Sequence, residues 1–388
     1  NVTVTAVNDA PSLTNLDTPA AFLENTINAT PAIIDADVTF ADIDLLDLDG
    51  GTLTVSGLDV DDVVSVNSMG VGLNNVRLNV DVVEFDSTGA GGWTQFGAVA
   101  GGGGVDLVIT FDTDSTPALV DTLIENINYM NTSDVPPASH DLSFTVLDGD
   151  GGSTGAQTAT ITITAENDAP SFSGLNANPT FVEDGAAIVL DADAIIVDPE
   201  LDAADDYGGA TLTIVRNGGN NADDVFANTG NLTTLTESGT FNLGGGNIGT
   251  VTTNSNGTLV LTFAAGATSV NVDEVLQSIT YSNSNNNPLA TVLLDYTIND
   301  QNVAPAQGAG LALSGPGSIT VNLIPTNDAP SASNLTTTSF YNEDDPSVAI
   351  TDIVVTDPDN AEEITAILTL TNTATGALSA NDGAFYDS

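Results

Sequence analysis

The chain has 388 residues, a length typical of two or three domains rather than of one large core. Its 53 acidic residues face two basic ones and give a formal net charge of −51, so nucleic acid and anionic membranes are excluded as partners and cations are favoured. It has no Cys, which excludes disulfides and thiolate chemistry, and no apolar run long enough to span a bilayer, so we expect no membrane insertion in this segment.

Hydrophobic residues make up 41% of the chain, which is enough for folded segments despite the charge. Only eleven of the acidic residues are Glu. The rest are Asp, the shorter carboxylate, which favours turns and oxygen-ligated metal loops over helix surfaces. We therefore expect a folded chain whose acidic residues lie mainly in loops.

The segment Asn-Asp-Ala-Pro-Ser recurs at a nearly constant interval, at residues 8–12, 167–171 and 327–331. Each copy follows an alternating polar and apolar segment, which predicts a strand that ends where the proline begins a linker. Residues 1–7 are predicted to be the last strand of a preceding repeat, 8–166 and 167–326 two repeats, and 327–388 the first part of a further repeat. We expect the chain to belong to a longer array.

Within each repeat, we predict seven to nine short strands rich in Val, Ile, Leu and Thr and separated by Gly, Asn and Asp turns, a pattern typical of a β-sandwich. The Gly-rich residues 89–104 and residues 303–317 are predicted to be loops. Residues 120–129 and 272–281 space their apolar side chains at helical intervals before a Tyr. This spacing predicts a short helical turn whose Leu, Ile and Tyr side chains belong to the core.

Four features recur in the same order around the linkers: the Asn-Asp pair itself, an aromatic-x-Glu segment after it, paired acids before the first long strand, and an Asp near the penultimate strand. Together they resemble the cadherin-like repeats of large bacterial surface adhesins, which are related to proteoglycan-type (CSPG) repeats. The resemblance spans essentially the whole chain. It implies an all-β fold of tandem Ig-like or cadherin-like β-sandwich modules in an elongated array, with Ca²⁺ at each junction.

The resemblance also assigns the calcium ligands, which are carboxylate and amide oxygens, the hard donors that Ca²⁺ prefers. They are the linker residues Asn8, Asp9, Asn167, Asp168, Asn327 and Asp328; the glutamates Glu24, Glu183 and Glu343; the paired acids Asp42, Asp44, Asp198, Glu200, Asp357 and Asp359; and Asp148 and Asp300. At the central linker we expect Asn167, Asp168, Glu183, Asp198, Glu200 and Asp300 to converge on one ion or two. A third ion is not expected, because the chain lacks the Asp-Arg-Glu motif of eukaryotic cadherins.

Electrostatics favours a cation in such clusters, because two carboxylates about 4 Å apart repel by about 4 kcal/mol at an effective dielectric constant near 20. The alternative is that Asp and Asn only form turns and that the acidity keeps a marine or halophilic protein in solution. That alternative is preferred for scattered acids such as Asp59, Asp61 and Asp223.

We expect no enzymatic activity. With 53 acidic residues, carboxylate pairs suited to glycoside hydrolysis arise throughout the chain and identify nothing. The single histidine, His140, is expected on a surface loop, and its neighbours Ser139 and Asp141 cannot complete a triad with it.

The sequence thus predicts an extracellular, calcium-rigidified rod that presents or links binding domains at a bacterial cell surface. Its expected partners are calcium ions and the neighbouring repeats of the same chain. The alternative is a self-assembling subunit of an extracellular filament, sheath or surface layer, with calcium-bridged contacts between identical chains. An open sheet edge would favour that alternative.

Overall fold

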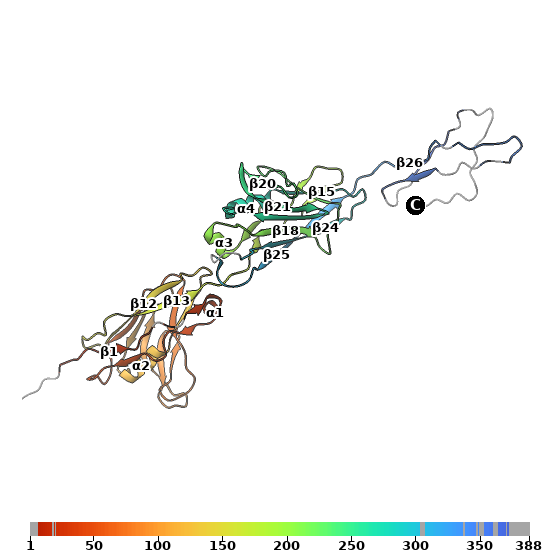
Figure 1. Ribbon diagram of the computed structural model, residues 1–388. Coiled ribbons are helices and arrows are strands. Elements are labelled where there is room, and N and C mark those ends of the chain that lie inside the picture. Colours follow the sequence, from red (N-terminus) through yellow and green to blue (C-terminus); the bar gives the residue numbers. More distant parts are fainter. Residues whose placement is uncertain are drawn as a thin grey trace, which may run out of the picture. The chain divides into compact units, whose positions relative to one another are not determined.

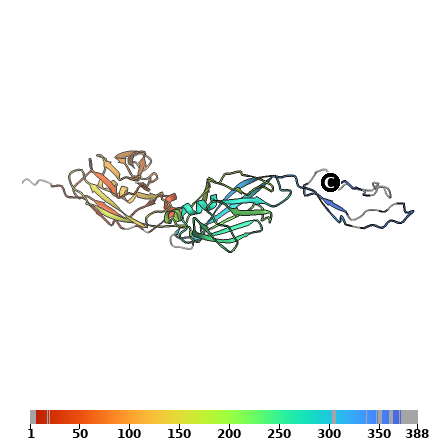
Figure 2. The ribbon, with the colours of Figure 1, turned by 90° about the horizontal axis from the view of Figure 1, so that it is seen from above.

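The computed structural model describes residues 7–17, 19, 21–302, 307–336, 338–346, 348, 353–359, 364–369 and 371. Residues 1–6, expected in a preceding repeat, lie outside this set, as do parts of 303–317 and of 327–388. The chain forms two compact units, each built mainly from strands (Figures 1 and 2). The first unit comprises Asn1–Asp168, Asp198–Ala204 and Asn302–Leu313, and the second comprises Ala169–Val197, Asp205–Gln301 and Ser314–Ser388.

The first unit is a β-sandwich of short strands. In chain order they are β1 (Ser12–Thr14), β2 (Phe22–Leu23), β3 (Ala32–Ile33), β4 (Thr39–Ala41), β5 (Thr52–Ser56), β6 (Asp62–Val66), β7 (Val76–Asn79), β8 (Val82–Asp86), β9 (Trp93–Ala100), β10 (Leu107–Phe111), β11 (Ile127–Asn131), β12 (Ser139–Leu147) and β13 (Gln157–Thr164). The main sheet has the order β2-β13-β12-β5-β10-β9-β8-β7. A second sheet has the order β3-β11-β6, and β1 pairs with β4.

The second unit repeats this arrangement. Its strands are β14 (Ser171–Ser173), β15 (Thr180–Val182), β16 (Ile188–Val189), β17 (Ile195–Val197), β18 (Thr211–Arg216), β19 (Asp224–Asn228), β20 (Thr240–Leu243), β21 (Gly246–Ser255), β22 (Thr258–Phe263), β23 (Ile279–Asn283), β24 (Thr291–Asn299), β25 (Ser314–Ile324), β26 (Ser331–Ser333) and β27 (Val354–Thr356). The sheets have the orders β15-β25-β24-β18-β22-β21-β20 and β16-β23-β19, with β14 paired to β17 and β26 to β27. The predicted all-β fold of tandem sandwiches is confirmed, with more and shorter strands per module than expected.

One strand pair in each module is parallel. β2 pairs with β13 through Phe22 and Ile163, and β15 pairs with β25 through Phe181 and Leu323. The remaining strand pairs of the two main sheets are antiparallel. The parallel pair therefore places the residue after β2 beside the residues after the last strand of the same module.

The predicted helical turns are confirmed as α2 (Pro117–Glu125) and α4 (Ser269–Gln277), each followed directly by a strand. Thr116 and Thr268 cap their N-termini, since each side-chain oxygen accepts a backbone N–H of the first turn. Each helix also binds a nearby strand: the Asp121 carboxylate accepts the N–H of Phe40 at 2.6 Å, and the Asp273 carboxylate accepts that of Ile196 at 2.9 Å.

Buried alternate residues of the strands form the core, and the Tyr side chains that follow the helices belong to it. Tyr129 and Tyr281 are both fully buried. The predicted loops were wrong in part, because β9 lies within residues 89–104 and β25 begins at Ser314. A glycine-rich composition suggested a loop, but Gly97 is required in the ladder, since a Cβ there would lie 2.9 Å from the carbonyl oxygen of Thr110. No helix within the described ranges is long and apolar enough to cross a membrane.

The contribution of α2 to the first module can be tested at Leu123, which is fully buried. We expect Leu123→Ala to lower the free energy of unfolding of this module by about 2–5 kcal/mol, because it leaves a cavity in a packed core. Trp93 is the only tryptophan and lies in the first module, so its fluorescence during urea unfolding reports this module alone. Leu276→Ala, in the helix of the second module, is the matched control and should leave the Trp93 transition in place; an equal effect of both variants would contradict the assignment.

Candidate metal centre

The fold brings Glu24 to the central linker, residues 167–171. Glu24 follows β2 and begins the short helix α1 (Glu24–Ala29), so the parallel pairing of β2 with β13 places it beside the residues after β13. The Glu24 Oε2 atom accepts the backbone N–H of Glu166 at 2.9 Å, and the Glu166 carboxylate accepts the N–H of Asn25 at 3.1 Å. Glu24 is fully buried. In Figure 1, α1 and β1 lie at opposite ends of the first sandwich.

Asp168 and Glu200 meet in the same region of the first unit. The N–H of Asp168 donates to Glu200 Oε1 at 3.3 Å. Glu200 lies in the short helix α3 (Pro199–Ala204), and the carboxylate of Asp198 accepts the N–H of Leu201 at its start. The linker is also held by Asn167, whose N–H donates to the carbonyl of Ala309 at 2.9 Å. Asp168 is half-buried, and Glu200 is buried.

A fourth acid, Asp134, completes this group and was missed by the sequence analysis. Carboxylate oxygens of Glu24, Asp134 and Asp168 all lie within 4.8 Å of one another. Asp134 is in the exposed loop between β11 and β12, a loop in which the second repeat has Asn instead of an acid. The available signal was the position of this loop, at the same end of the sandwich as the end of β13. We call Glu24, Asp134, Asp168 and Glu200 the linker cluster.

Three oxygens of the linker cluster are buried without a hydrogen-bond partner among the described residues: Glu24 Oε1, Asp168 Oδ2 and Glu200 Oε2. Burial raises the pKa of Glu24 from 4.5 to about 7, against the N–H of Glu166 and with help from the charges of Asp168 and Asp134. Burial likewise raises the pKa of Glu200 to about 8, and the pKa of Asp168 is raised by burial and by the charge of Asp134. Proximity and desolvation thus oppose the ionised form of the cluster.

The chain's own cations are used elsewhere. It has two arginines, one histidine and no lysine. Arg77 pairs with Glu84 at 2.6 Å, Arg216 with Asp224 at 2.6 Å, and His140 with Asp62 at 3.1 Å. No basic side chain of this chain is therefore left to neutralise the linker cluster.

The first linker gathers a similar set of predicted residues. Asn8 Nδ2 donates to Asp148 Oδ2 at 2.8 Å, and the N–H of Asp9 donates to the Asp44 carboxylate at 3.0 Å. Asp42 Oδ1 accepts the N–H of Asp44, whereas Asp42 Oδ2 is buried without a hydrogen-bond partner among the described residues. Burial raises the pKa of Asp42, and its bond with the Asp44 side chain adds to this effect.

The pKa of Asp148 is lowered, whereas that of Asp42 is raised. Burial alone would raise its pKa, but the side chain of Asn8 and the N–H groups of Gly152, Asp150 and Gly151 together hold that pKa below its usual value. Asp148 is therefore a satisfied anion even without a metal.

The third linker, in the second unit, repeats the hydrogen bonds of the central one. The Glu183 Oε2 atom accepts the N–H of Thr326 at 2.8 Å, and the N–H of Asp328 donates to the Asp359 carboxylate at 2.5 Å. Glu183 Oε1 and Asp328 Oδ2 are buried without a hydrogen-bond partner among the described residues. Burial and the charge of Asp359 raise the pKa of Asp328.

These contacts correct the predicted grouping. Glu183 was predicted to lie with Asn167 and Asp168, but it bonds to the linker that follows its own module. Glu24 occupies the corresponding place at the central linker. The reason is the parallel edge pair, which carries each glutamate to the far end of its sandwich.

The other predicted ligands are placed as follows. Asp300 is buried and comes directly after β24. Asp357 follows β27, and the Asp357 carboxylate accepts the N–H of Asp359. Glu343 is exposed. Asn327 donates to the carbonyl of Asp328. The convergence of Asp300 with the central linker stays a prediction.

His140 was expected on a surface loop, and this expectation was wrong. It lies in β12, and its imidazole faces the fully buried Asp62 of β6. Sequence neighbours gave no sign of this pair, because it joins strands of different sheets.

No protein-family model matches the chain, and no characterised protein matches its sequence. Among solved structures, the protocadherin GammaB4 extracellular domain is 13% identical, with a TM-score of 0.28 over 91% of this chain and 41% of that one. Mouse cadherin-23 EC22-24 is 11% identical, with a TM-score of 0.27 over 84% of this chain and 71% of that one. The titin domains z1z2, solved in complex with telethonin, are 11% identical, with a TM-score of 0.22 over 84% of this chain and 100% of that one. This chain thus spans about two fifths of the protocadherin GammaB4 structure. These likenesses are slight, and the all-β fold is established by the strands themselves.

The raised pKa values predict a pH dependence of stability in a chelator. Glu24 and Glu200 have pKa values of about 7 and about 8 in the folded chain, against 4.5 for an ordinary Glu. The folded state therefore binds more protons than the unfolded state between these values, so its stability falls as the pH rises from about 4.5 to about 8. We expect the melting temperature of the first module, followed by Trp93 fluorescence in EDTA, to fall over this range.

Replacing Glu24 by Gln should make the melting temperature fall less steeply with pH. The neutral amide does not titrate, so the difference in bound protons between the folded and unfolded states decreases by up to about one. Glu237→Gln is the matched control, because Ser255 and the N–H of Asn254 hold the pKa of Glu237 below its usual value. A slope that is the same in wild type and Glu24→Gln would show that Glu24 is not the titrating group.

Proposed function

We propose that this chain is a repeat region of an extracellular adhesive protein, in which calcium bound at each linker stiffens a string of β-sandwich modules that presents or links binding domains at a cell surface. The observation that carries the proposal is the linker cluster. Its buried carboxylate oxygens have no hydrogen-bond partner among the described residues, and every basic side chain of the chain is paired elsewhere. A divalent cation would supply the missing charge.

Ca²⁺ is the ion whose chemistry fits best. The donors are oxygens only, from carboxylates on several segments, and Ca²⁺ takes six to eight oxygen ligands at about 2.3–2.6 Å in flexible geometry. Glu24 Oε1, Asp168 Oδ2 and Glu200 Oε2 would bind it directly. Asp134 would bind from its exposed loop, since its carboxylate already lies within 4.8 Å of those of Glu24 and Asp168. The remaining positions would be filled by water or by backbone carbonyls. Mg²⁺ demands a stricter octahedron and keeps more of its water than a site of four carboxylates from separate segments would allow.

The mechanical consequence follows from where the ligands lie. Glu24 belongs to the sandwich, Asp168 to the linker, and Glu200 to α3. An ion held by all three restricts rotation about the backbone bonds of the linker, and removing the ion leaves carboxylates that repel one another. The same logic extends to the first linker through Asn8, Asp9, Asp42 and Asp44, and to the third.

A hydrogen bond that recurs at the linkers supports the proposed repeat boundaries. In all three, the N–H of the linker Asp donates to the second of the paired acids: Asp9 to Asp44, Asp168 to Glu200, and Asp328 to Asp359. This pattern supports repeats at 8–166 and 167–326, followed by part of another from 327. It is also consistent with the cadherin-like repeats of bacterial surface adhesins.

Self-assembly into a filament, sheath or surface layer is the second candidate, and the outer edge of the first main sheet gives it little support. The outer strand of the first main sheet is β7, which has four residues and carries Arg77, ion-paired to Glu84. A short edge that bears a charge disfavours the addition of a strand from another chain. We therefore retain the stiffened repeat region as the function.

Small-angle scattering tests the proposal directly. We expect the wild-type chain to have a narrower distribution of interatomic distances in 10 mM calcium than in EDTA, because the bound ion fixes the linker. Asp168→Asn removes one ligand charge while preserving side-chain shape, and should keep the broad, EDTA-like distribution in calcium. Asp141→Asn, in an exposed strand position away from the linkers, is the matched control and should behave as the wild type.

Calcium should also raise the Trp93-detected melting temperature of the wild type. With dissociation constants of about 10⁻⁴–10⁻³ M, as in extracellular calcium modules, 10 mM calcium gives a shift of about 3–10 °C, which Asp168→Asn should reduce. Two results would refute the calcium-stiffened rod: an equal shift with NaCl of the same ionic strength, or a wild type equally flexible in calcium and in EDTA. Either would support the alternative that the acidity only keeps a halophilic protein in solution.

A further inference from the structure

Each module buries one aspartate at the same place. Asp62 begins β6 and Asp224 begins β19, and both are almost fully buried. In each case a Tyr hydroxyl donates to the carboxylate at 2.6 Å, from Tyr129 or Tyr281. The side chain of Asn131 or Asn283, two residues after the Tyr in the Tyr strand, donates to the same carboxylate at 2.9 and 3.0 Å. The two carboxylates therefore share their neutral donors.

The modules differ in the basic side chain that faces this carboxylate. In the second module, Arg216 Nε and Nη2 donate to the two oxygens of Asp224 at 2.7 and 2.6 Å, which neutralises it permanently. The first module has Gly57 at the place of Arg216, directly after β5. His140 of β12 faces Asp62 instead, with Nε2 at 3.1 Å from Oδ2. The equivalent of His140 in β24 is Val292.

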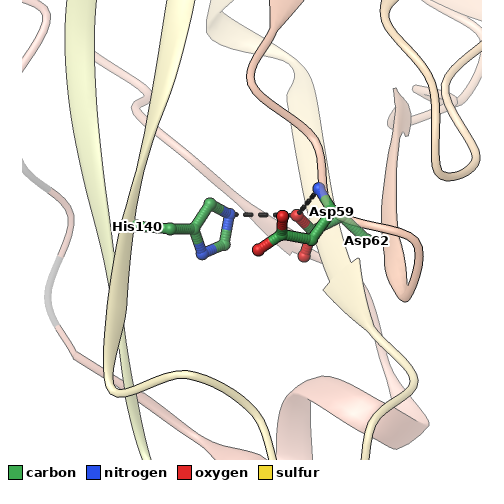
Figure 3. A group of neighbouring side chains, drawn as sticks. All are labelled: Asp59, Asp62 and His140. Atoms are coloured by element: carbon green, nitrogen blue, oxygen red, sulfur yellow. Dashed lines mark hydrogen bonds and ion pairs between the residues drawn. The ribbon is translucent and has the colours of Figure 1, made fainter.

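A third group joins the first module's pair. The N–H of Asp59 donates to Asp62 Oδ2 at 2.7 Å, and ligand atoms of Asp59, Asp62 and His140 all lie within 4.8 Å of one another. Figure 3 shows the imidazole pointing from its strand toward both carboxylates. In the second module, Asn221 takes the place of Asp59, since its carbonyl accepts the N–H of Asp224 as that of Asp59 accepts the N–H of Asp62. The module with Arg216 thus lacks both the imidazole and the outer carboxylate.

We propose that Asp59, Asp62 and His140 bind a divalent transition-metal ion of the zinc class, in the first module only. One imidazole nitrogen with two carboxylates is a donor set that suits zinc and disfavours calcium, which prefers oxygen alone. The 3.1 Å between His140 Nε2 and Asp62 Oδ2 is close to the separation of about 3.3 Å between two ligands that each lie about 2.0 Å from a tetrahedral ion. The fourth position is open to water on the side of the exposed Asp59.

The 3.1 Å gap between His140 Nε2 and Asp62 Oδ2 must hold a proton or a metal ion, for a simple electrostatic reason. An imidazole that directs its Nε2 lone pair at a buried carboxylate is repelled by it, so Nε2 either carries a proton, which it donates to Asp62, or binds a metal ion. The acidic groups around the ring are Asp62 and Asp59 on one side and the adjacent Asp141, with the Tyr129 ring at a centroid distance of 5.7 Å. His140 Nδ1 has no hydrogen-bond partner among the described residues. We therefore expect affinity below that of structural zinc sites, whose histidines are oriented by an outer partner.

Cobalt(II) absorption tests the site on the full chain. The chain is first saturated with 10 mM calcium, so that oxygen-only sites are occupied, and is then titrated with Co²⁺ at pH 7.5. We expect one Co²⁺ per chain, with the intense visible bands of four-coordinate cobalt, and displacement of these bands by an equimolar amount of Zn²⁺. Calorimetry with Zn²⁺ should give the same stoichiometry.

Two variants replace a proposed ligand by the residue at the equivalent place in the second module. His140→Val should abolish the four-coordinate bands and weaken Zn²⁺ binding by more than about 100-fold, beyond the 10–100-fold typical of losing an outer partner. Asp59→Asn leaves the His140 and Asp62 pair intact, so the module stays folded, and should weaken binding at least about tenfold. Asp141→Asn, which removes a neighbouring charge but no ligand, should bind as the wild type does.

Octahedral cobalt spectra, several weak ions per chain, or binding that is unchanged in His140→Val and Asp59→Asn would overturn the proposal. No zinc binding by the wild type in calcium would overturn it as well, and His140 Nε2 would then simply donate a proton to Asp62. These outcomes are separate from the calcium proposal, because Asp168→Asn should leave the cobalt bands unchanged.

Discussion

Burying a carboxylate costs several kcal/mol unless its oxygens find donors or a cation, and this chain buries carboxylates throughout its modules. One solution uses backbone N–H groups. Asp86 at the end of β8 is wrapped by the Gly-rich turn, where the N–H groups of Gly72, Gly91 and Gly92 donate to it. Burial raises its pKa, but these bonds and those from Thr88 outweigh that effect and lower the pKa to about 2.

A second solution uses side-chain hydrogen-bond donors inside the sandwich. Burial would raise the pKa of Asp62, yet His140, Tyr129, the N–H of Asp59 and Asn131 together lower it to about 2. The linker cluster follows neither solution. Glu24 and Glu200 are as well buried as these aspartates, but their pKa values move in the opposite direction, because each keeps an oxygen without a hydrogen-bond partner among the described residues. This contrast within one chain is the main support for the proposal that an external cation binds at the linkers.

Much of this could be predicted from the sequence, because repetition carries information that single residues do not. The period of the linker motif, the helical segments before Tyr129 and Tyr281, and the association of Asp168 with Glu200 all follow from position within the repeat. The partner of Glu24 could not be predicted, because it depends on β2 running parallel to β13, and a two-residue strand does not reveal its direction. His140 was misjudged for a related reason, since its partner lies on a strand of the other sheet. Asp134 was missed because one acid in a loop is unremarkable among 53.

The central claim is that calcium completes the linker cluster. A crystal structure of the chain grown in millimolar calcium, with anomalous scattering used to identify the ion, measures this most directly. We expect an anomalous peak about 2.3–2.6 Å from Glu24 Oε1, Asp168 Oδ2 and Glu200 Oε2, with Glu183 and Asp328 forming the equivalent site at the next linker. Density for water alone at these oxygens, or carboxylates that turn away from one another with calcium present, would contradict it.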